Sequence, residues 1–172
     1  MPNDQPFPTE YRPCVGLLVL NRAGQIWIGE RLEARNDAEG LGTWWQMPQG
    51  GIDPGEDPVA AAMRELKEET GITSAAILGE TTDWHHYEFP PEFAVKAWGG
   101  RFRGQKQKWF AMRFTGDDGE IDISSHDPRL QPEFGRWRWC AKDDLIDNVV
   151  EFKRHIYRAV LAEFDPLILP AP

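Results

Sequence analysis

The chain has 172 residues, which suits a single domain over residues 1–172 with one packed core. Its composition, 41% hydrophobic, 12% aromatic and 27% charged, excludes a disordered or fibrous protein. The formal net charge of -9 argues against a protein that holds long nucleic acid mainly through its phosphates, because that mode needs many Lys and Arg contacts. Recognition of a nucleic-acid end stays open.

Cysteine usage and the N-terminus indicate where such a protein works. Cys14 and Cys140 each stand alone in an apolar or aromatic run, so we expect reduced core residues of a cytoplasmic protein. Residues 1–12 contain no apolar signal segment, and no run approaches the roughly 18 apolar residues that a membrane span requires. We expect no membrane association and no protein partner, and therefore a monomer.

The first half of the chain predicts a hairpin, a loop and a helix. Apolar runs at 14–20 and 25–30 are separated by turn residues. Residues 31–43 are polar, and they form either a loop over a site or a surface insertion. Asp57 followed by Pro58 is typical of a helix start, and Gly71 supplies the stop. The helix has apolar residues at buried-face spacing: Val59, Ala62, Met63 and Leu66.

The second half predicts three more strands and a last helix. The strands are 75–80, 108–114 and 136–140. The helix is indicated by the helical spacing of Val149, Phe152, Ile156, Val160 and Phe164, and Pro166 ends it. The fold class is therefore α+β, with strands grouped around two main helices.

The first helix carries the candidate chemistry. Glu65, Glu68 and Glu69 stand at i, i+3 and i+4, so three carboxylates share one surface and repel one another. Mg²⁺ with its hard oxygen ligands would offset that repulsion, and Arg64 could orient one carboxylate. Glu56 adds a fourth acid at the entrance of the loop. A solvated acidic helix face is the alternative that these residues alone leave open.

A longer pattern resolves that choice. Gly50, five residues, Glu56, seven residues and then 64–72 (RELKEETGI) match the nine specified positions of the Nudix box over 23 residues, so the chain resembles the Nudix hydrolases. The resemblance implies an α/β/α sandwich around a mixed sheet, with the box as a loop–helix–loop that binds Mg²⁺, for which Mn²⁺ or another divalent cation could substitute. It also implies hydrolysis of a phosphoanhydride bond, with a metal site that includes Gly50, Glu65, Glu68 and Glu69. Glu69 is our first choice as general base and Glu68 the second.

Further motifs extend the resemblance over about residues 10–165. They are Tyr11-Arg12-Pro13, 45–51 (WQMPQGG), 104–110 (GQKQKWF), 132–134 (PEF) and 150–154 (VEFKR). Together they resemble the subgroup that contains RNA pyrophosphohydrolases and asymmetric diadenosine tetraphosphate (Ap4A) hydrolases. The implied substrates are the 5′-triphosphate end of RNA, diadenosine polyphosphates, or both. Free nucleoside triphosphates are an alternative, and a binding module without catalysis is a remote one because all the box acids are present.

The resemblance also assigns roles outside the box. Glu133 would reach the metal site, although an ordinary surface acid is the alternative. The phosphate contacts would come from Arg12, Lys106, Lys108 and Lys153, with Gly51 in the same neighbourhood. The basic stretch 96–108 would then face phosphates instead of forming a solvated loop.

The aromatic residues and two differences from the bacterial RNA enzymes leave the identity of the substrate undecided. Phe152 is either a core residue or a platform that stacks on a nucleobase, and Tyr87 and Trp84 line a base pocket or belong to the core. The longer 31–43 segment and the second tryptophan in Trp44-Trp45 depart from the bacterial RNA enzymes. Sequence segments such as 87–92 (YEFPPE) resemble the plant Ap4A enzymes instead.

Overall fold

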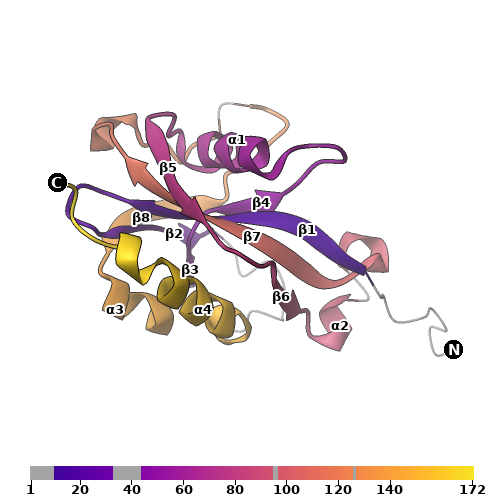
Figure 1. Ribbon diagram of the computed structural model, residues 1–172. Coiled ribbons are helices and arrows are strands. Elements are labelled where there is room, and N and C mark those ends of the chain that lie inside the picture. Colours follow the sequence, from indigo (N-terminus) through magenta and orange to yellow (C-terminus); the bar gives the residue numbers. More distant parts are fainter. Residues whose placement is uncertain (1–9, 33–43, 95–96, 126) are drawn as a thin grey trace, which may run out of the picture.

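The computed structural model describes residues 10–32, 44–94, 97–125 and 127–172. Eight strands form one mixed sheet, and its two long central strands, β1 (Glu10–Leu20) and β7 (Phe102–Phe114), run parallel to each other. Such pairs need a crossover connection, and here α1 (Pro58–Thr70) lies in it. The expected α/β/α sandwich with a mixed sheet is confirmed (Figure 1).

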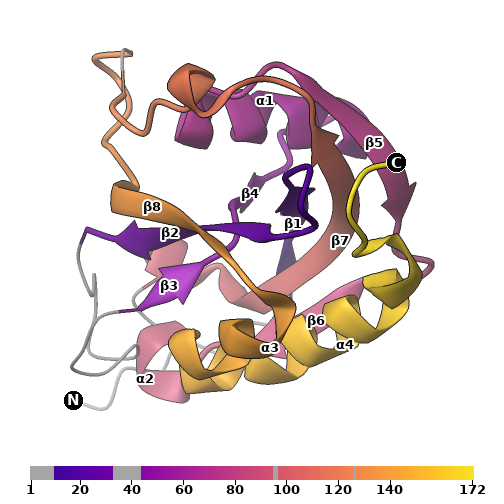
Figure 2. The same cartoon turned by 90° about the vertical axis from the view of Figure 1, so that its left-hand side faces the viewer.

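The sheet divides at the first hairpin. Strand β2 (Ile26–Arg31) pairs with β1 only beside the turn, at Leu20 and Ile26. Farther along, β1 pairs with β4 (Gln49–Gly51), whereas β2 pairs with β3 (Trp45–Gln46) and β8 (Phe134–Cys140). Figure 2 shows the two groups of strands diverging from that hairpin. The space between them is where polar side chains can gather.

Two apolar clusters lie on the two faces of the sheet. Alternate residues of β1 point to opposite faces, so Val15 and Leu17 pack on the side of α1 and Leu18 on the side of α4 (Arg154–Phe164). The short helix α3 (Lys142–Leu145) lies beside α4, and both cover the face opposite α1 (Figure 1). Both cysteines are free and buried, as expected for reduced core residues.

Strands β5 (Ala75–Glu80) and β6 (His85–Glu88) both pair antiparallel with β7 and complete that half of the sheet. The short helix α2 (Pro91–Ala94) follows β6. Single 3-10 turns occur at 97–100, 118–120, 146–148, 151–153 and 165–167. Among the described residues, no helix is long and apolar enough to span a membrane.

Several predicted boundaries were wrong. The strand predicted at 108–114 begins at Phe102, because its first half pairs with β1 and β6 through polar residues. The last helix begins at Arg154 and not at Val149: Phe152 lies in a 3-10 turn that packs on the same core, which extends the apolar pattern beyond the helix. Residues 33–43 and Lys96 lie outside the described residues.

Candidate active site

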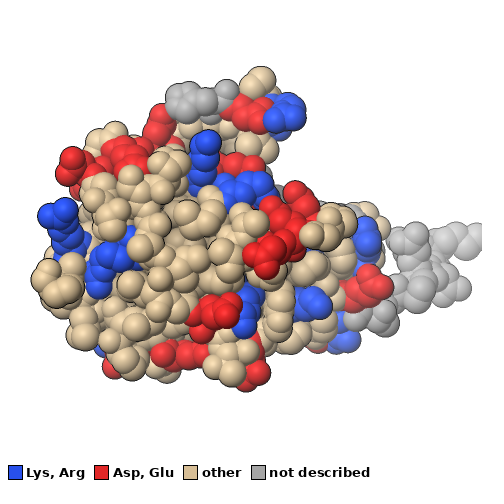
Figure 3. Space-filling view, turned by 45° about the horizontal axis from the view of Figure 1, so that its top comes forward, with Lys and Arg blue, Asp and Glu red and all other residues tan. Residues whose placement is uncertain are grey.

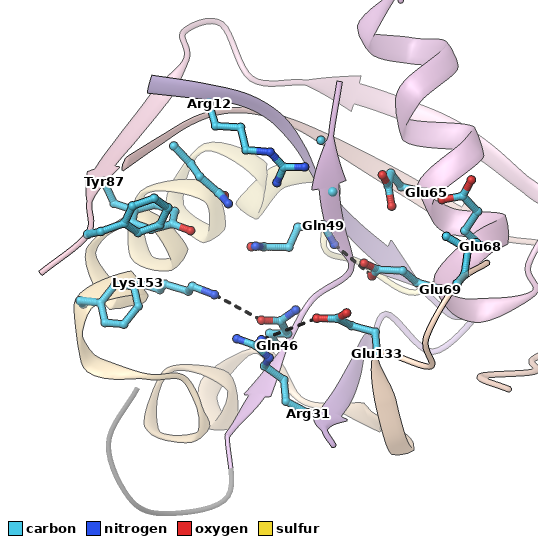
Figure 4. A pocket seen from close by; sticks show the side chains of 16 residues that line it. Arg12, Arg31, Gln46, Gln49, Glu65, Glu68, Glu69, Tyr87, Glu133 and Lys153 are labelled. Carbon is cyan, nitrogen blue, oxygen red and sulfur yellow. Dashed lines mark hydrogen bonds and ion pairs between the residues drawn. The ribbon is translucent and has the colours of Figure 1, made fainter. Parts of the chain in front are cut away.

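A cavity of about 430 Å³ opens where the sheet divides. Its lining comes from β1, β2, β3, β4, α1, β6, β7, the 3-10 turn at 151–153 and the segment before β8. In Figure 4 the acids of α1 lie on one side, and Arg12, Tyr87 and Lys153 lie on the other. The cavity thus joins an acidic wall to a cationic and aromatic wall.

The helix that supplies the acids is fixed at both ends. The Asp57 carboxylate accepts from the backbone N–H groups of Val59 (3.0 Å) and Ala60 (3.3 Å), and Pro58 takes the first helical position. At the other end Gly71 has φ 73°, a left-handed conformation that favours glycine. Both predicted ends of this helix are confirmed.

Arg64 organises the box carboxylates. Its guanidinium donates to Glu56 (2.8 Å), Glu65 (2.9 Å) and Glu68 (3.3 Å). It also donates to the backbone oxygen of Gly51 at 2.9 Å, which links α1 to β4. The pKa of Glu56 is lowered to about 2, mainly by its hydrogen bond from Arg64. Arg64 therefore orients Glu65 and Glu68 as well as Glu56, and Glu56 does not line the cavity.

Glu65 and Glu69, which are partly buried, have raised pKa values. Burial raises the pKa of Glu65 to about 7, although Arg64 acts in the opposite direction. Burial also raises the pKa of Glu69, and the neighbouring Glu133 and Glu65 carboxylates add to that effect. Glu69 accepts from the Gln49 backbone N–H at 3.3 Å. Desolvated carboxylates of this kind fit a divalent cation as their counter-charge.

The four acids proposed for the metal site, Glu65, Glu68, Glu69 and Glu133, do not form a preassembled metal-binding cluster. Within the described ranges, no three acidic, His or Cys side chains converge at metal-binding distances. All four acids nevertheless line the same cavity. This arrangement suits Mg²⁺, which usually keeps several waters and needs only a few protein carboxylates together with substrate phosphates.

The two glycines before the helix make room for side chains. A Cβ at Gly50 would overlap the Glu65 carboxyl group, and a Cβ at Gly51 would overlap the Arg12 guanidinium. Both glycines line the cavity. Their lack of a side chain therefore lets an acid and a base lie close to the same short strand.

Lys106 and Lys108 do not line the cavity. Residues alternate along β7, so Gln105 points into the cavity while Lys106 and Lys108 point to the other face. There the Lys106 ammonium lies 5.5 Å from the Trp84 ring centroid, and Lys108 donates to the Thr82 backbone oxygen at 3.4 Å. The implied phosphate contacts of Lys106 and Lys108 are therefore not supported by their placement. Trp84, for which a base pocket and the core were the alternatives, is 36% exposed and does not line the cavity.

The other residues predicted outside the box do reach the cavity. Arg12, Tyr87 and Lys153 line it, and Glu133 lies 3.7 Å from Arg31 in an ion pair. Phe152 packs against the core and also lines the cavity, with its ring centroid 5.7 Å from that of Tyr87, so stacking on a nucleobase stays a prediction.

Four polar lining residues were missed from the sequence, Arg31, Gln46, Gln49 and Gln105, and so were the apolar Phe89 and Leu130. The three glutamines lie in the motifs 45–51 and 104–110, so the polar residues within otherwise apolar strands were the available signal. Gln46 accepts from the Lys153 ammonium at 3.3 Å. Arg31 carries no such signal, because it stands at the end of a strand where an exposed basic residue is ordinary.

Charge on the side of α1 is mixed. Figure 3 shows Lys and Arg side chains lying among Asp and Glu side chains, and no continuous basic surface is visible among the described residues of that face. Binding through many phosphates along a strand would need such a surface. A single concave site for one end of a ligand fits this face better.

Comparison with known proteins agrees with this geometry. The family model described as NUDIX domain matches residues 10–160. A protein named RNA pyrophosphohydrolase from Azorhizobium caulinodans is 52% identical over 161 residues, covering 90% of this chain and 92% of that protein. The protein of the same name from Brucella ovis is 50% identical over 160 residues, covering 92% and 90%.

Solved structures share the fold at low identity. An Ap4A hydrolase complex from C. elegans superposes with a TM-score of 0.58 at 20% identity, covering 89% of this chain and 98% of that one. The E. coli dihydroneopterin triphosphate pyrophosphohydrolase has a TM-score of 0.63 at 14% identity, covering 90% and 99%. With the box, the cavity and the family match in agreement, this chain belongs to the NUDIX domain family of hydrolases.

Proposed function

We propose that the protein is a Mg²⁺-dependent hydrolase that removes pyrophosphate from the 5′ end of triphosphorylated RNA, with or instead of asymmetric cleavage of Ap4A. The supporting observation is the cavity, which four carboxylates line together with Arg12, Lys153 and three aromatic rings. Relatives of about half identity over most of both chains carry the name RNA pyrophosphohydrolase. The Ap4A part rests on the sequence motifs, since the C. elegans enzyme shares only the fold.

Glu65, Glu68, Glu69 and Glu133, together with Gly50, would hold the cation. When bound, Mg²⁺ neutralises phosphate oxygens and makes a coordinated water a stronger nucleophile. Arg64 keeps Glu65 and Glu68 in place through its hydrogen bonds. We assign the proton-accepting role to Glu69, whose own contact is the Gln49 backbone N–H, with Glu68 as the second choice.

The opposite wall would bind the substrate. Arg12 and Lys153 supply positive charge for the phosphates, and Gly51 leaves the space that the Arg12 guanidinium occupies. Tyr87 and Phe152 form an aromatic surface on which a nucleobase can stack, a contact worth about 1–3 kcal/mol. Lys106 and Lys108 are left out of this set because they point to the other face of β7.

Parallel turnover assays test the substrate. We expect pyrophosphate release from 5′-triphosphate RNA or asymmetric products from Ap4A in the presence of Mg²⁺, and the ratio of the two kcat/KM values decides between them. If neither substrate is consumed, the proposed subgroup is wrong. Rapid turnover of free nucleoside triphosphates, with poor activity on both larger substrates, would instead indicate an enzyme that removes free nucleotides.

A further inference from the structure

A chain of side-chain hydrogen bonds runs beneath the cavity from Trp109 to Gln105 and Gln49. The Trp109 indole donates to Gln107 Oε1 at 3.0 Å. Gln107 Nε2 donates to Gln105 Oε1 at 3.0 Å and to Gln49 Oε1 at 3.2 Å. Gln107 is 1% exposed and Gln105 is 4% exposed, so these polar groups depend on one another rather than on water.

The indole sets the direction of every bond in this chain. An indole N–H can only donate, whereas an amide has an accepting oxygen and a donating NH2 group. The Gln107 oxygen must therefore face Trp109, and its NH2 group must face the oxygens of Gln49 and Gln105. Those two amides are left with their NH2 groups turned away from Gln107. The orientation of three amides, which could otherwise reverse, thus follows from one residue.

Trp109 is held rigidly enough to set that direction. It is fully buried, and a Cβ at Gly16 would overlap its ring, so the glycine on β1 lies flat against the indole. The Tyr157 ring meets the indole edge-on at 5.5 Å between centroids. The Tyr157 hydroxyl is itself fixed by the Met47 backbone N–H at 2.9 Å. The start of the chain is therefore fixed by packing on two sides.

The other end of the chain faces the cavity. Gln105 pairs in register with Arg12 on β1 and with Tyr87 on β6, and these three side chains share one face of the sheet. In Figure 4 Gln49 lies between Tyr87 and the acids of α1. Gln49 and Gln105 both line the cavity.

We propose that this network turns the floor of the cavity into a surface of hydrogen-bond donors for the phosphate chain of the substrate, and that Gln107 is its positioning residue. Ionised phosphate oxygens only accept, so donors from Gln105 and Gln49 suit them, whereas a reversed amide would present a repelling oxygen. The donors are neutral and cost no buried charge. The proposal rests on the proposed function in taking a phosphate chain as the ligand.

Two variants and one control test it by titration with inorganic pyrophosphate in the presence of Mg²⁺. Gln107→Glu can still accept from Trp109 but cannot donate, so the amides of Gln49 and Gln105 should reverse. Trp109→Phe removes the indole donor and leaves Gln107 free to turn. Trp139→Phe is the matched control, because its indole N–H bonds to Asp118 at 3.1 Å on the surface of β8, outside the cavity.

We expect the Kd for pyrophosphate and the KM for substrate to rise by roughly tenfold or more in both variants, with a smaller change in kcat, while the control matches wild type. Unchanged Kd values in the folded variants would overturn the proposal. A loss of affinity that is confined to substrates with a guanine base, with normal pyrophosphate binding, would also overturn the proposal. The cavity floor would then recognise a nucleobase and not the phosphate chain. Pyrophosphate binding does not depend on which substrate is turned over, so the proposal and the proposed function can fail separately.

A measurement on the wild-type protein tests the proposal without relying on the variants to fold. The side-chain NH2 resonances of Gln49 and Gln105 should shift when Mg²⁺ and pyrophosphate are added, whereas those of Gln25, which lies in the β1–β2 turn and accepts from Asn21 at 3.0 Å, should not. If the resonances of Gln49 and Gln105 do not respond at saturating pyrophosphate, the donors do not face the ligand and the proposal is wrong.

Discussion

Arg64 offsets the repulsion between the carboxylates of the box. Like charges at i, i+3 and i+4 destabilise a helix, and burial adds to that cost for Glu65 and Glu69. The guanidinium bonds to Glu65 and Glu68, while Glu69 is left with the backbone N–H of Gln49. The acid that is least compensated is thus the one to which we assign proton transfer.

Replacing that acid should separate activity from stability. We expect Glu69→Gln to lower kcat by about 10²–10⁴-fold, since a general base contributes that much, while the melting temperature stays equal or rises because a buried charge is removed. Steady-state kinetics and thermal unfolding check this, with the exposed Glu80→Gln as a control. Wild-type activity in Glu69→Gln and in Glu68→Gln would refute the assigned mechanism.

At the scale of elements, α1 is defined by local chemistry. Its start depends on the Asp57 side chain and Pro58, and its end on Gly71, all of which are next to the helix in sequence. The acids can face the cavity only if this helix keeps its length and orientation. The cap therefore supports the site indirectly.

Removing the cap should cost stability but little activity. We expect Asp57→Ala to lower the free energy of unfolding by about 1 kcal/mol, because two backbone N–H groups lose their acceptor. Urea unfolding measures the change, and Asp57→Asn, which retains an acceptor, should lose less. Equal losses in both variants would mean that the charge and not the cap supports the helix.

The segment after α1 is held by one carboxylate. Glu120 accepts from the backbone N–H groups of Thr73 (2.8 Å) and Ser74 (2.9 Å). These bonds lower the pKa of Glu120 from its usual 4.5, with the Thr73 N–H as the largest cause. A lowered folded-state pKa stabilises the protein above pH 4.5, and this contribution is lost as the pH falls through the lower folded value.

Glu120→Gln should therefore be pH-sensitive in its effect. We expect the variant to be less stable than wild type by about 0.5–1.5 kcal/mol at pH 7, the net worth of a hydrogen bond, and the difference to shrink as wild-type Glu120 becomes protonated. Urea unfolding from pH 7 to pH 3 measures both. A difference that stays constant across this range would contradict the role of the charge.

At the scale of the whole molecule, the division of the sheet creates the site. Strands β1 and β7 stay paired along their length. Strands β2, β3 and β8 form a separate group that diverges from β1 at the β1–β2 hairpin. Acids of α1, polar residues of both halves and the turn before α4 meet in the resulting cavity. A cation bound there would connect segments that are far apart in the sequence.

Mg²⁺ should consequently stabilise the folded protein. A ligand at a hundredfold excess over its Kd adds about 2.7 kcal/mol, which raises the melting temperature by several degrees in a chain of this size. Thermal unfolding with Mg²⁺ and with a chelator checks this in wild type and in Glu68→Gln, where we expect a smaller shift. An equal shift from NaCl at matched ionic strength would attribute the effect to screening and not to a site.

The sequence by itself determined the elements whose causes are local. The caps of α1, the spacing of its glutamates and the hairpin turn depend on neighbouring residues, so their patterns can be read without a fold. The family resemblance also depends on such spacing. The boundaries of β7 and α4 could not be read in this way, because pairing with β1 and β6 extends the strand and core packing continues the apolar pattern beyond the helix.

Only the tertiary structure decided which faces meet. The alternating Gln and Lys residues at 105–108 show that the two kinds point to opposite sides, but not that the glutamines face the cavity and the lysines face away. That choice follows from the parallel register of β1 and β7, which places Gln105 beside Arg12. Long-range strand pairing carries no local signal, so the donors of the cavity floor become visible only in the folded chain.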